Sequence, residues 1–247
     1  MPDDAGWDWP GFSVREFGDV TGTTWRRRVD QCALIPLLLR PLQELDADFS
    51  SYPIYQLPEV HIAVRERYEQ GAEHNQGWRA SKLVVYAHSE RDGVGPHAAA
   101  GIYVEKGTGA DEFGKVTRHL WDWPRFVDLV ADPVRRAPLI RAFERHPLRI
   151  GDYTGGRFGP GGCQVGFVGS TEDGDLVLRD GSGVESGRGW DDLTAALRSL
   201  PEGVWHDLHL WREWPADEAI RAGQPFAVEQ LLPVLRDLAA VYLSTIQ

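Results

Sequence analysis

The sequence predicts an α+β fold with a mostly antiparallel sheet, built from hairpins and covered by helices that include a long C-terminal helix. Two observations support this class. The expected strands come in adjacent pairs instead of alternating with helices, which argues against a doubly wound parallel sheet. Hydrophobic residues make up 42% of the 247 residues, enough to build a core. No long linker divides the chain, so we expect a single globular domain over residues 1–247, with residues 1–23 as a candidate loosely packed N-terminal arm.

The clearest hairpin joins Lys82–His88 to His97–Glu105. Apolar and polar residues alternate in both segments, and the turn-rich stretch Ser89–Pro96 lies between them. If His88 faces His97 across the pair, the polar side chains gather on one face, because side chains alternate between the two faces of a strand. That face then holds Lys82, Tyr86, His88, His97, Tyr103 and Glu105.

Alternation predicts further strands elsewhere in the chain. One pair of them is expected to turn at Glu172-Asp173-Gly174. Residues 46–58, which contain two prolines, and the glycine-rich residues 151–162 are predicted to lack regular structure. The further strands span residues 60–64, 163–169, 175–179 and 204–211.

Helices are expected where apolar residues recur at helical spacing. Asp132 can cap one of them, and Pro133 fits its first turn. Pro36 and Pro41 predict two short helices or a kinked one near the N-terminus, and Pro233 predicts a kink in the last helix. The expected helices span residues 33–45, 124–130, 133–145, 191–200 and 226–243.

The net negative charge of the chain makes some classes of binding partner less favourable than others. Acidic residues outnumber basic ones by 37 to 26, which gives a net charge of −11. Such an excess disfavours nucleic acid and anionic membranes, whose binding depends on Lys and Arg. The N-terminal residues lack a secretory signal, and two cysteines are too few for a disulfide scaffold, so we expect a cytoplasmic protein without a membrane segment.

A tetrapeptide, Trp-Asp-Trp-Pro, occurs at residues 7–10 and 121–124, with a looser copy at residues 211–215. The flanking sequences do not align, which argues against a repeat architecture. The favoured interpretation is structural: the proline opens a helix and the indole packs into the core. The alternative is an aromatic surface that stacks on a ligand or a protein partner.

The first candidate site lies on the strand over residues 204–211. Trp205, Asp207, His209 and Trp211 share one face, while His206 falls on the other face with Leu208 and Leu210. Asp207 beside His209 could hold a general base in one tautomer or grip a polar ligand between the two indoles. The competing interpretation is a face whose tryptophans only pack under the terminal helix.

His88 and His97 form the second candidate, as an acid/base pair across the hairpin. No recognised ligand spacing supports a metal there, and no metal site is predicted. The third candidate is a basic segment that runs into a glycine-rich loop, where arginines and backbone N–H groups could bind an anion. Its arginines are Arg141, Arg145, Arg149 and Arg157.

Three functional hypotheses remain open. The favoured one is a protein that binds or acts on a small anionic or polar ligand through these candidates. The first alternative is an acidic interaction module for a basic protein partner, and the second is a nuclease or other nucleic-acid-associated defence protein, which the charge disfavours. No motif identifies a cofactor, a known catalytic signature or a family.

Overall fold

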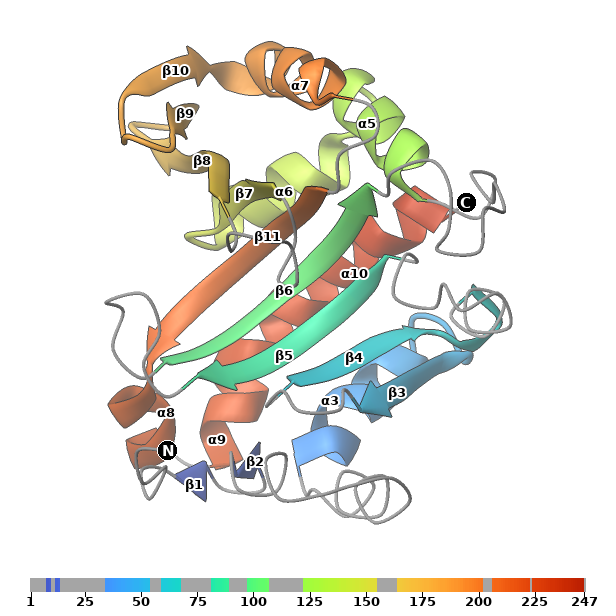
Figure 1. Cartoon of the computed structure of the whole chain (residues 1–247). Helices are drawn as coiled ribbons and strands as arrows, with labels where there is room; N and C mark the ends of the chain where they lie inside the picture. The colour runs from blue at the N-terminus through green and yellow to red at the C-terminus, as the bar shows by residue number, and fades with distance from the viewer. Residues whose placement is uncertain are drawn as a thin grey trace, which may run out of the picture. The chain divides into compact units, whose positions relative to one another are not determined.

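The fold is α+β, as predicted from the sequence, with a nine-stranded antiparallel sheet and helices packed against it (Figure 1). The structure is a computed structural model that describes residues 8–9, 12–13, 34–53, 59–67, 81–88, 97–106, 122–154, 164–201, 206–222 and 224–246. The strand order is β10-β9-β8-β7-β11-β6-β5-β4-β3. Two more strands, β1 (Asp8–Trp9) and β2 (Phe12–Ser13), pair only with each other.

The strands of the large sheet are β3 (Phe49–Pro53), β4 (Glu59–Val64), β5 (Lys82–His88), β6 (His97–Lys106), β7 (Arg149–Thr154), β8 (Gln164–Glu172), β9 (Asp175–Asp180), β10 (Glu185–Arg188) and β11 (His206–Pro215). The helices are α3 (Leu34–Gln43), α5 (Trp123–Ala131), α6 (Ala137–Arg145), α7 (Gly189–Ser199), α8 (Ala216–Ala222), α9 (Gln224–Phe226), the π-helix η3 (Ala227–Leu231) and α10 (Leu232–Ile246).

The chain divides into two compact units, which are described separately. Unit 1 comprises Met1–Arg65, Leu83–Gly101 and Arg212–Arg236. Unit 2 comprises Glu66–Lys82, Ile102–Trp211 and Asp237–Gln247. The single-domain interpretation of residues 1–247, with an arm over residues 1–23, stays a prediction.

Unit 1 corrects one sequence prediction, because residues 49–53 are strand β3 and not a loop. Their partner is β4, with Phe49 opposite Val64 and Pro53 opposite Val60. Phe49 is fully buried and anchors the strand in the core. Proline is tolerated here because β3 lies at the edge of the sheet, where a missing backbone N–H breaks no ladder.

Unit 2 corrects a second prediction, because residues 151–154 belong to strand β7 and are not irregular. The strand pairs with β11 on one side and β8 on the other. Gly151, which suggested a loop, is a glycine because of packing: a Cβ atom there would lie 3.1 Å from the Trp211 ring. Residues 155–163 lie outside the described residues.

The β8–β9 hairpin turns at Asp173 and Gly174, as predicted. Both residues have positive φ, 51° and 88°, which is typical of a two-residue type I′ turn. The space around Gly174 is open, so only backbone strain opposes a side chain at this position.

Replacing Gly174 with alanine is expected to lower the free energy of unfolding by about 1 kcal/mol, because an L-residue with positive φ is strained. Urea unfolding at equilibrium measures the change. The Asp173→Gly variant is the matched control, since it relieves the same kind of strain and should not destabilise the protein. Equal losses in the two variants would contradict this explanation.

The central helices begin and end close to the predicted limits. Asp132 accepts hydrogen bonds from the backbone N–H groups of Val134 and Arg135, at 2.8 and 3.2 Å. These bonds, led by the one from Val134, lower the pKa of Asp132. The cap is therefore present, but residues 133–136 form a turn and α6 begins only at Ala137.

The C-terminal helix is continuous from α9 to α10, as predicted, and its irregularity lies just before Pro233. In η3 the Leu232 N–H donates to the carbonyl of Ala227, five residues back. A proline ring collides with the carbonyl four residues before it, and one wider turn is a known way to relieve that clash. Buried residues of α10 include Leu238, Val241 and Tyr242, which contribute to the core.

Candidate functional site

A group of polar and aromatic side chains in unit 2 lies on one face of the sheet, on β5, β6 and β11. Tyr103 stacks on His209, and Lys82 forms an ion pair with Glu105, so these strands direct polar side chains to the same side. Asp207 and Trp211 flank His209 at a spacing of two residues and therefore share its face. We call this group the polar sheet face. It consists of Lys82, Tyr103, Glu105, Asp207, His209 and Trp211.

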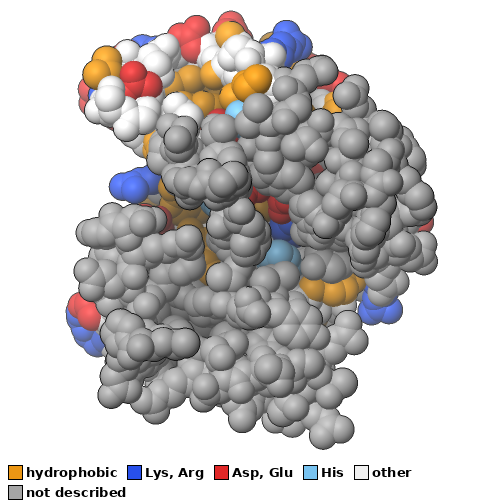
Figure 2. Space-filling view, in the orientation of Figure 1, with side chains coloured by type: hydrophobic (Ala, Val, Ile, Leu, Met, Phe, Trp, Pro, Cys, Tyr) orange, Lys and Arg blue, Asp and Glu red, His pale blue; other side chains and the backbone are white. Residues whose placement is uncertain are grey.

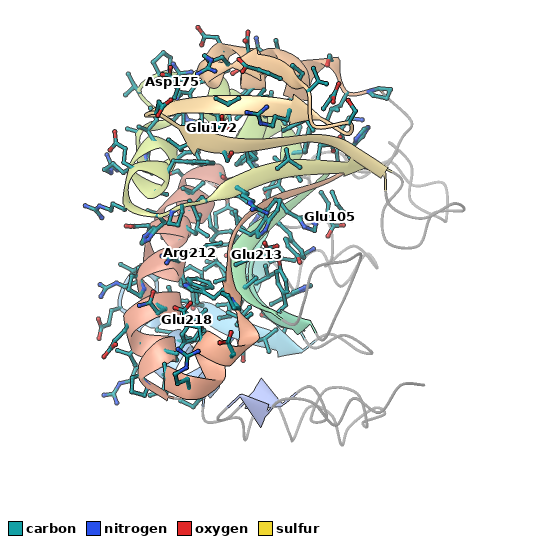
Figure 3. All side chains as sticks on the ribbon, turned by 90° about the vertical axis from the view of Figure 1, so that its left-hand side faces the viewer. Glu105, Glu172, Asp175, Arg212, Glu213 and Glu218 are labelled. Carbon is teal, nitrogen blue, oxygen red and sulfur yellow. The ribbon has the colours of Figure 1, made fainter. Side chains whose placement is uncertain are left out.

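Lys82 and Glu105 form a buried ion pair between neighbouring strands. The Lys82 ammonium donates a hydrogen bond to Oε1 of Glu105, and the two residues are only 1% and 8% exposed. Figure 3 shows Glu105 on the side of β6 that faces away from the helix ribbon. Figure 2 shows basic, acidic and histidine side chains between atoms drawn in grey, where Figure 1 draws β5, β6 and β11.

The second half of the polar sheet face is aromatic. The rings of Tyr103 and His209 lie 3.9 Å apart and nearly parallel, with an interplanar angle of 15°. The Trp211 ring meets the His209 ring edge-on, with the two ring centroids 6.2 Å apart. Gly151 lies opposite His209 in the ladder, and its missing side chain leaves the room that the Trp211 indole occupies. The stack fixes the plane of the His209 ring.

The prediction that Asp207, His209 and Trp211 share a face agrees with the strand register, in which they oppose Tyr153, Gly151 and Arg149 of β7. Asp207 and His209 are half-buried, and Trp211 is buried. Trp205 lies outside the described residues, so its predicted place beside Asp207 and His209 stays a prediction.

His88 ends β5 and His97 begins β6, but their side chains lie outside the described residues. The predicted acid/base pair therefore stays a prediction. Within the described residues no group of three or more His, Cys, Asp or Glu side chains is arranged to hold a metal ion.

The arginines of the predicted anion site do not form one row. Arg141 and Arg145 lie on α6, which ends at Arg145. Arg149 lies in strand β7. Arg145 is paired with Asp237, at 3.0 Å. Arg157 lies outside the described residues, so the loop half of this site stays a prediction.

The Trp-Asp-Trp-Pro sequence at residues 121–124 is structural in the part that the structure describes. Trp123 is buried and begins α5, with Pro124 in its first turn. Asp122 does not cap this helix through its side chain; its carboxylate accepts a hydrogen bond from Arg67 and one from the Ser81 N–H at 2.8 Å. This aspartate fastens the start of α5 to the start of β5.

In the looser copy at residues 211–215 both tryptophans are buried, Trp211 in unit 2 and Trp214 in unit 1. Trp214 is 2% exposed and packs edge-on against Phe226, while the Arg212 guanidinium lies over its ring at 4.6 Å. Desolvation lowers the pKa of Arg212, and Glu218 offsets part of this effect. Figure 3 shows Arg212 and Glu218 on the same side of β11. Buried Trp123 and Trp214 give no support to an exposed tryptophan surface for a protein partner.

Sequence reasoning missed a second polar pair in unit 2, on the other face of β11. The side chains of Asp152 and His206 are buried and in contact, 3.0 Å apart. Asp152 was hidden in the stretch predicted to be irregular. The signal that could have found the pair is His206 itself, a histidine at a position of β11 that alternates with apolar Leu208 and Leu210.

Comparisons with protein-family models, with curated proteins and with solved structures found no match. Among the described residues, no helix has the length and the apolar character needed to cross a membrane.

Proposed function

We propose that the protein binds a small polar ligand on the polar sheet face and uses His209 to exchange a proton with it. The observation that carries this proposal is the buried Lys82–Glu105 ion pair on the same sheet face as the Tyr103–His209 stack. Cytoplasmic localisation, expected from the two cysteines, belongs to the same proposal.

If stability were the only role of this sheet face, apolar side chains would serve it as well as a buried ion pair does. Burying two charges costs desolvation energy, and well-packed apolar residues are often as stabilising or more so. On the opposite face, β6 carries the buried apolar side chains of Ile102 and Val104, and Leu208 of β11 is also buried there. Charged and aromatic groups kept together instead are typical of a site that orients a polar ligand.

The described charges favour an uncharged or zwitterionic ligand over an anion. Lys82 contributes one positive charge, while Glu105 and Asp207 contribute two negative ones. Flat aromatic rings beside carboxylates suit sugars, nucleosides and amino acids, which present an apolar face and several hydrogen-bonding groups. An imidazole ring can accept a proton and return it, so His209 supplies a side chain suited to proton exchange.

A thermal-shift screen tests the proposal with neutral sugars, nucleosides, amino acids and inorganic phosphate. A ligand at 100 times its Kd stabilises the folded state by about 2.7 kcal/mol. For a chain of this size we expect Tm to rise by about 5–10 °C with one of the first three classes. The rise should vanish in His209→Ala, measured against that variant's own Tm, and persist in His146→Ala.

The proposal fails if none of the three uncharged or zwitterionic classes raises Tm. It also fails if the shift in His209→Ala equals that of the unmodified protein. A shift with phosphate alone would favour the arginine-rich segment as the binding site instead.

A further inference from the structure

Asp152 and His206 form a buried carboxylate–imidazole pair with one ring nitrogen left over. Nδ1 of His206 lies 3.0 Å from Oδ1 and 3.1 Å from Oδ2 of Asp152. Asp152 is 0% and His206 1% exposed. Nε2 of His206 is also buried and meets no hydrogen-bond partner within the described part of the chain.

The orientation of the pair decides its chemistry. An ionised carboxylate only accepts hydrogen bonds, so Nδ1 of the neutral ring carries the proton and donates to Asp152. Nε2 then carries a lone pair. A proton taken up at Nε2 makes an imidazolium ion, which the adjacent carboxylate stabilises.

The surrounding strands are shaped to hold the carboxylate. At Gly166 of β8 a Cβ atom would collide with Oδ2 of Asp152, so a larger residue there would force the carboxylate to shift. The β7–β8 ladder shifts register between Asp152 and Tyr153, and such bulges redirect individual side chains. His206 is the first residue of β11, directly opposite Thr154 at the end of β7.

A second histidine–aspartate pair in the same unit shows what a purely structural arrangement looks like. Nε2 of His146 lies 2.9 Å from Oδ2 of Asp237, whose other oxygen pairs with Arg145. His146 links the end of α6 to α10, and the ring atom that makes this contact is Nε2. In the Asp152–His206 pair the contact is made by Nδ1, and Nε2 has no hydrogen-bond partner within the described part of the chain.

We propose that His206 is a proton acceptor for the hydroxyl group of a bound substrate or of a water molecule, with Asp152 as its positioning residue. The O–H bond breaks, its electron pair stays on the oxygen, and the proton forms a new bond to Nε2, which gives an imidazolium ion beside the Asp152 carboxylate. The reverse transfer returns the proton from Nε2 to an oxygen and restores the neutral ring. This site is separate from the polar sheet face, because His206 and His209 project from opposite faces of β11.

A metal is the competing occupant of Nε2, since a histidine held by a carboxylate is a common metal ligand. A metal needs further ligands, and the described residues contain no group of three His, Cys, Asp or Glu side chains that could supply them. The geometry therefore favours proton transfer.

The first test is an NMR spectrum of the full chain with ¹⁵N-labelled histidine, which reports the ring tautomer. We expect His206 to carry its proton on Nδ1 and to have an unprotonated Nε2. In Asp152→Asn the new amide donates to Nδ1 and moves the ring proton to Nε2. A proton on Nε2 in the unmodified protein would overturn the proposal.

The second test is carbethoxylation with diethyl pyrocarbonate, read by mass spectrometry for each histidine. Native His206 should react without global unfolding, and Asp152→Asn should lower its rate at least about ten-fold, the scale expected for a positioning residue. His146 serves as the internal control, because its rate should not change.

Two further measurements use only the unmodified protein, so they remain decisive if Asp152→Asn does not fold. If His206 reacts only in proportion to the fraction unfolded by urea, its role is structural and the proposal fails. If ZnCl₂ protects His206 from carbethoxylation, the pair is a metal ligand and proton transfer is overturned.

Discussion

Replacing Lys82 with methionine is expected to lower the free energy of unfolding by roughly 3–5 kcal/mol. The variant removes the ammonium group and leaves the Glu105 carboxylate buried without the charge that now balances it. Urea unfolding at equilibrium measures the loss. This is the largest effect expected from any single change on the polar sheet face.

A double variant separates the value of the pair from the cost of breaking it. Lys82→Met combined with Glu105→Leu removes both charges and should recover most of the lost stability, because an apolar pair has no desolvation cost. Lys106→Met on the same strand as Glu105 is the surface control, and we expect it to change stability by less than about 1 kcal/mol. A double variant as unstable as Lys82→Met would show that the site cannot be stabilised by apolar packing.

Replacing Asp122 with alanine is expected to cost a similar amount, roughly 3–5 kcal/mol. Its carboxylate is buried and accepts hydrogen bonds from Arg67 and from the backbone N–H of Ser81. Removing it leaves the buried Ser81 N–H without this acceptor and the Arg67 guanidinium without this counter-charge. Thermal and urea unfolding of the variant measure the loss.

Asp128 is the matched control for this change, because it is an exposed aspartate on the same helix, α5. Asp128→Ala should stay within about 0.5 kcal/mol of the unmodified protein. If Asp122→Ala is equally mild, Asp122 does not fasten α5 to β5, and the structural interpretation of the Trp-Asp-Trp-Pro sequence is wrong.

Strands with regular alternation could be predicted from the sequence, and strands with glycine or proline could not. The bounds of the strand Lys82–His88 were predicted to the residue from its alternating pattern and the turn-rich stretch that follows it, although apolar Val84 shares the face of Lys82. Residues 49–53 and 151–154 were missed because Pro53 and Gly151 are usually found in loops. Both residues are explained by their tertiary surroundings. Pro53 is tolerated because β3 lies at the edge of the sheet, and Gly151 makes room for the Trp211 ring.

The candidate sites follow the same division. Alternation within one strand was enough to place Asp207 with His209 on one face and His206 on the other. Contacts between strands depend on register, which the sequence does not reveal. Tyr103 with His209 and Asp152 with His206 are contacts of this kind, and the second also depends on a β-bulge.

The two edges of the large sheet bear on how the protein behaves at high concentration. Exposed edge strands invite other chains to add to them, which leads to aggregation. The β10 edge is only four residues long, carries Glu185 and Arg188, and has an irregular register with β9. The β3 edge ends in Pro53, which has no N–H group to offer another strand. A short, irregular edge and an edge that ends in proline each offer another strand few backbone groups for pairing.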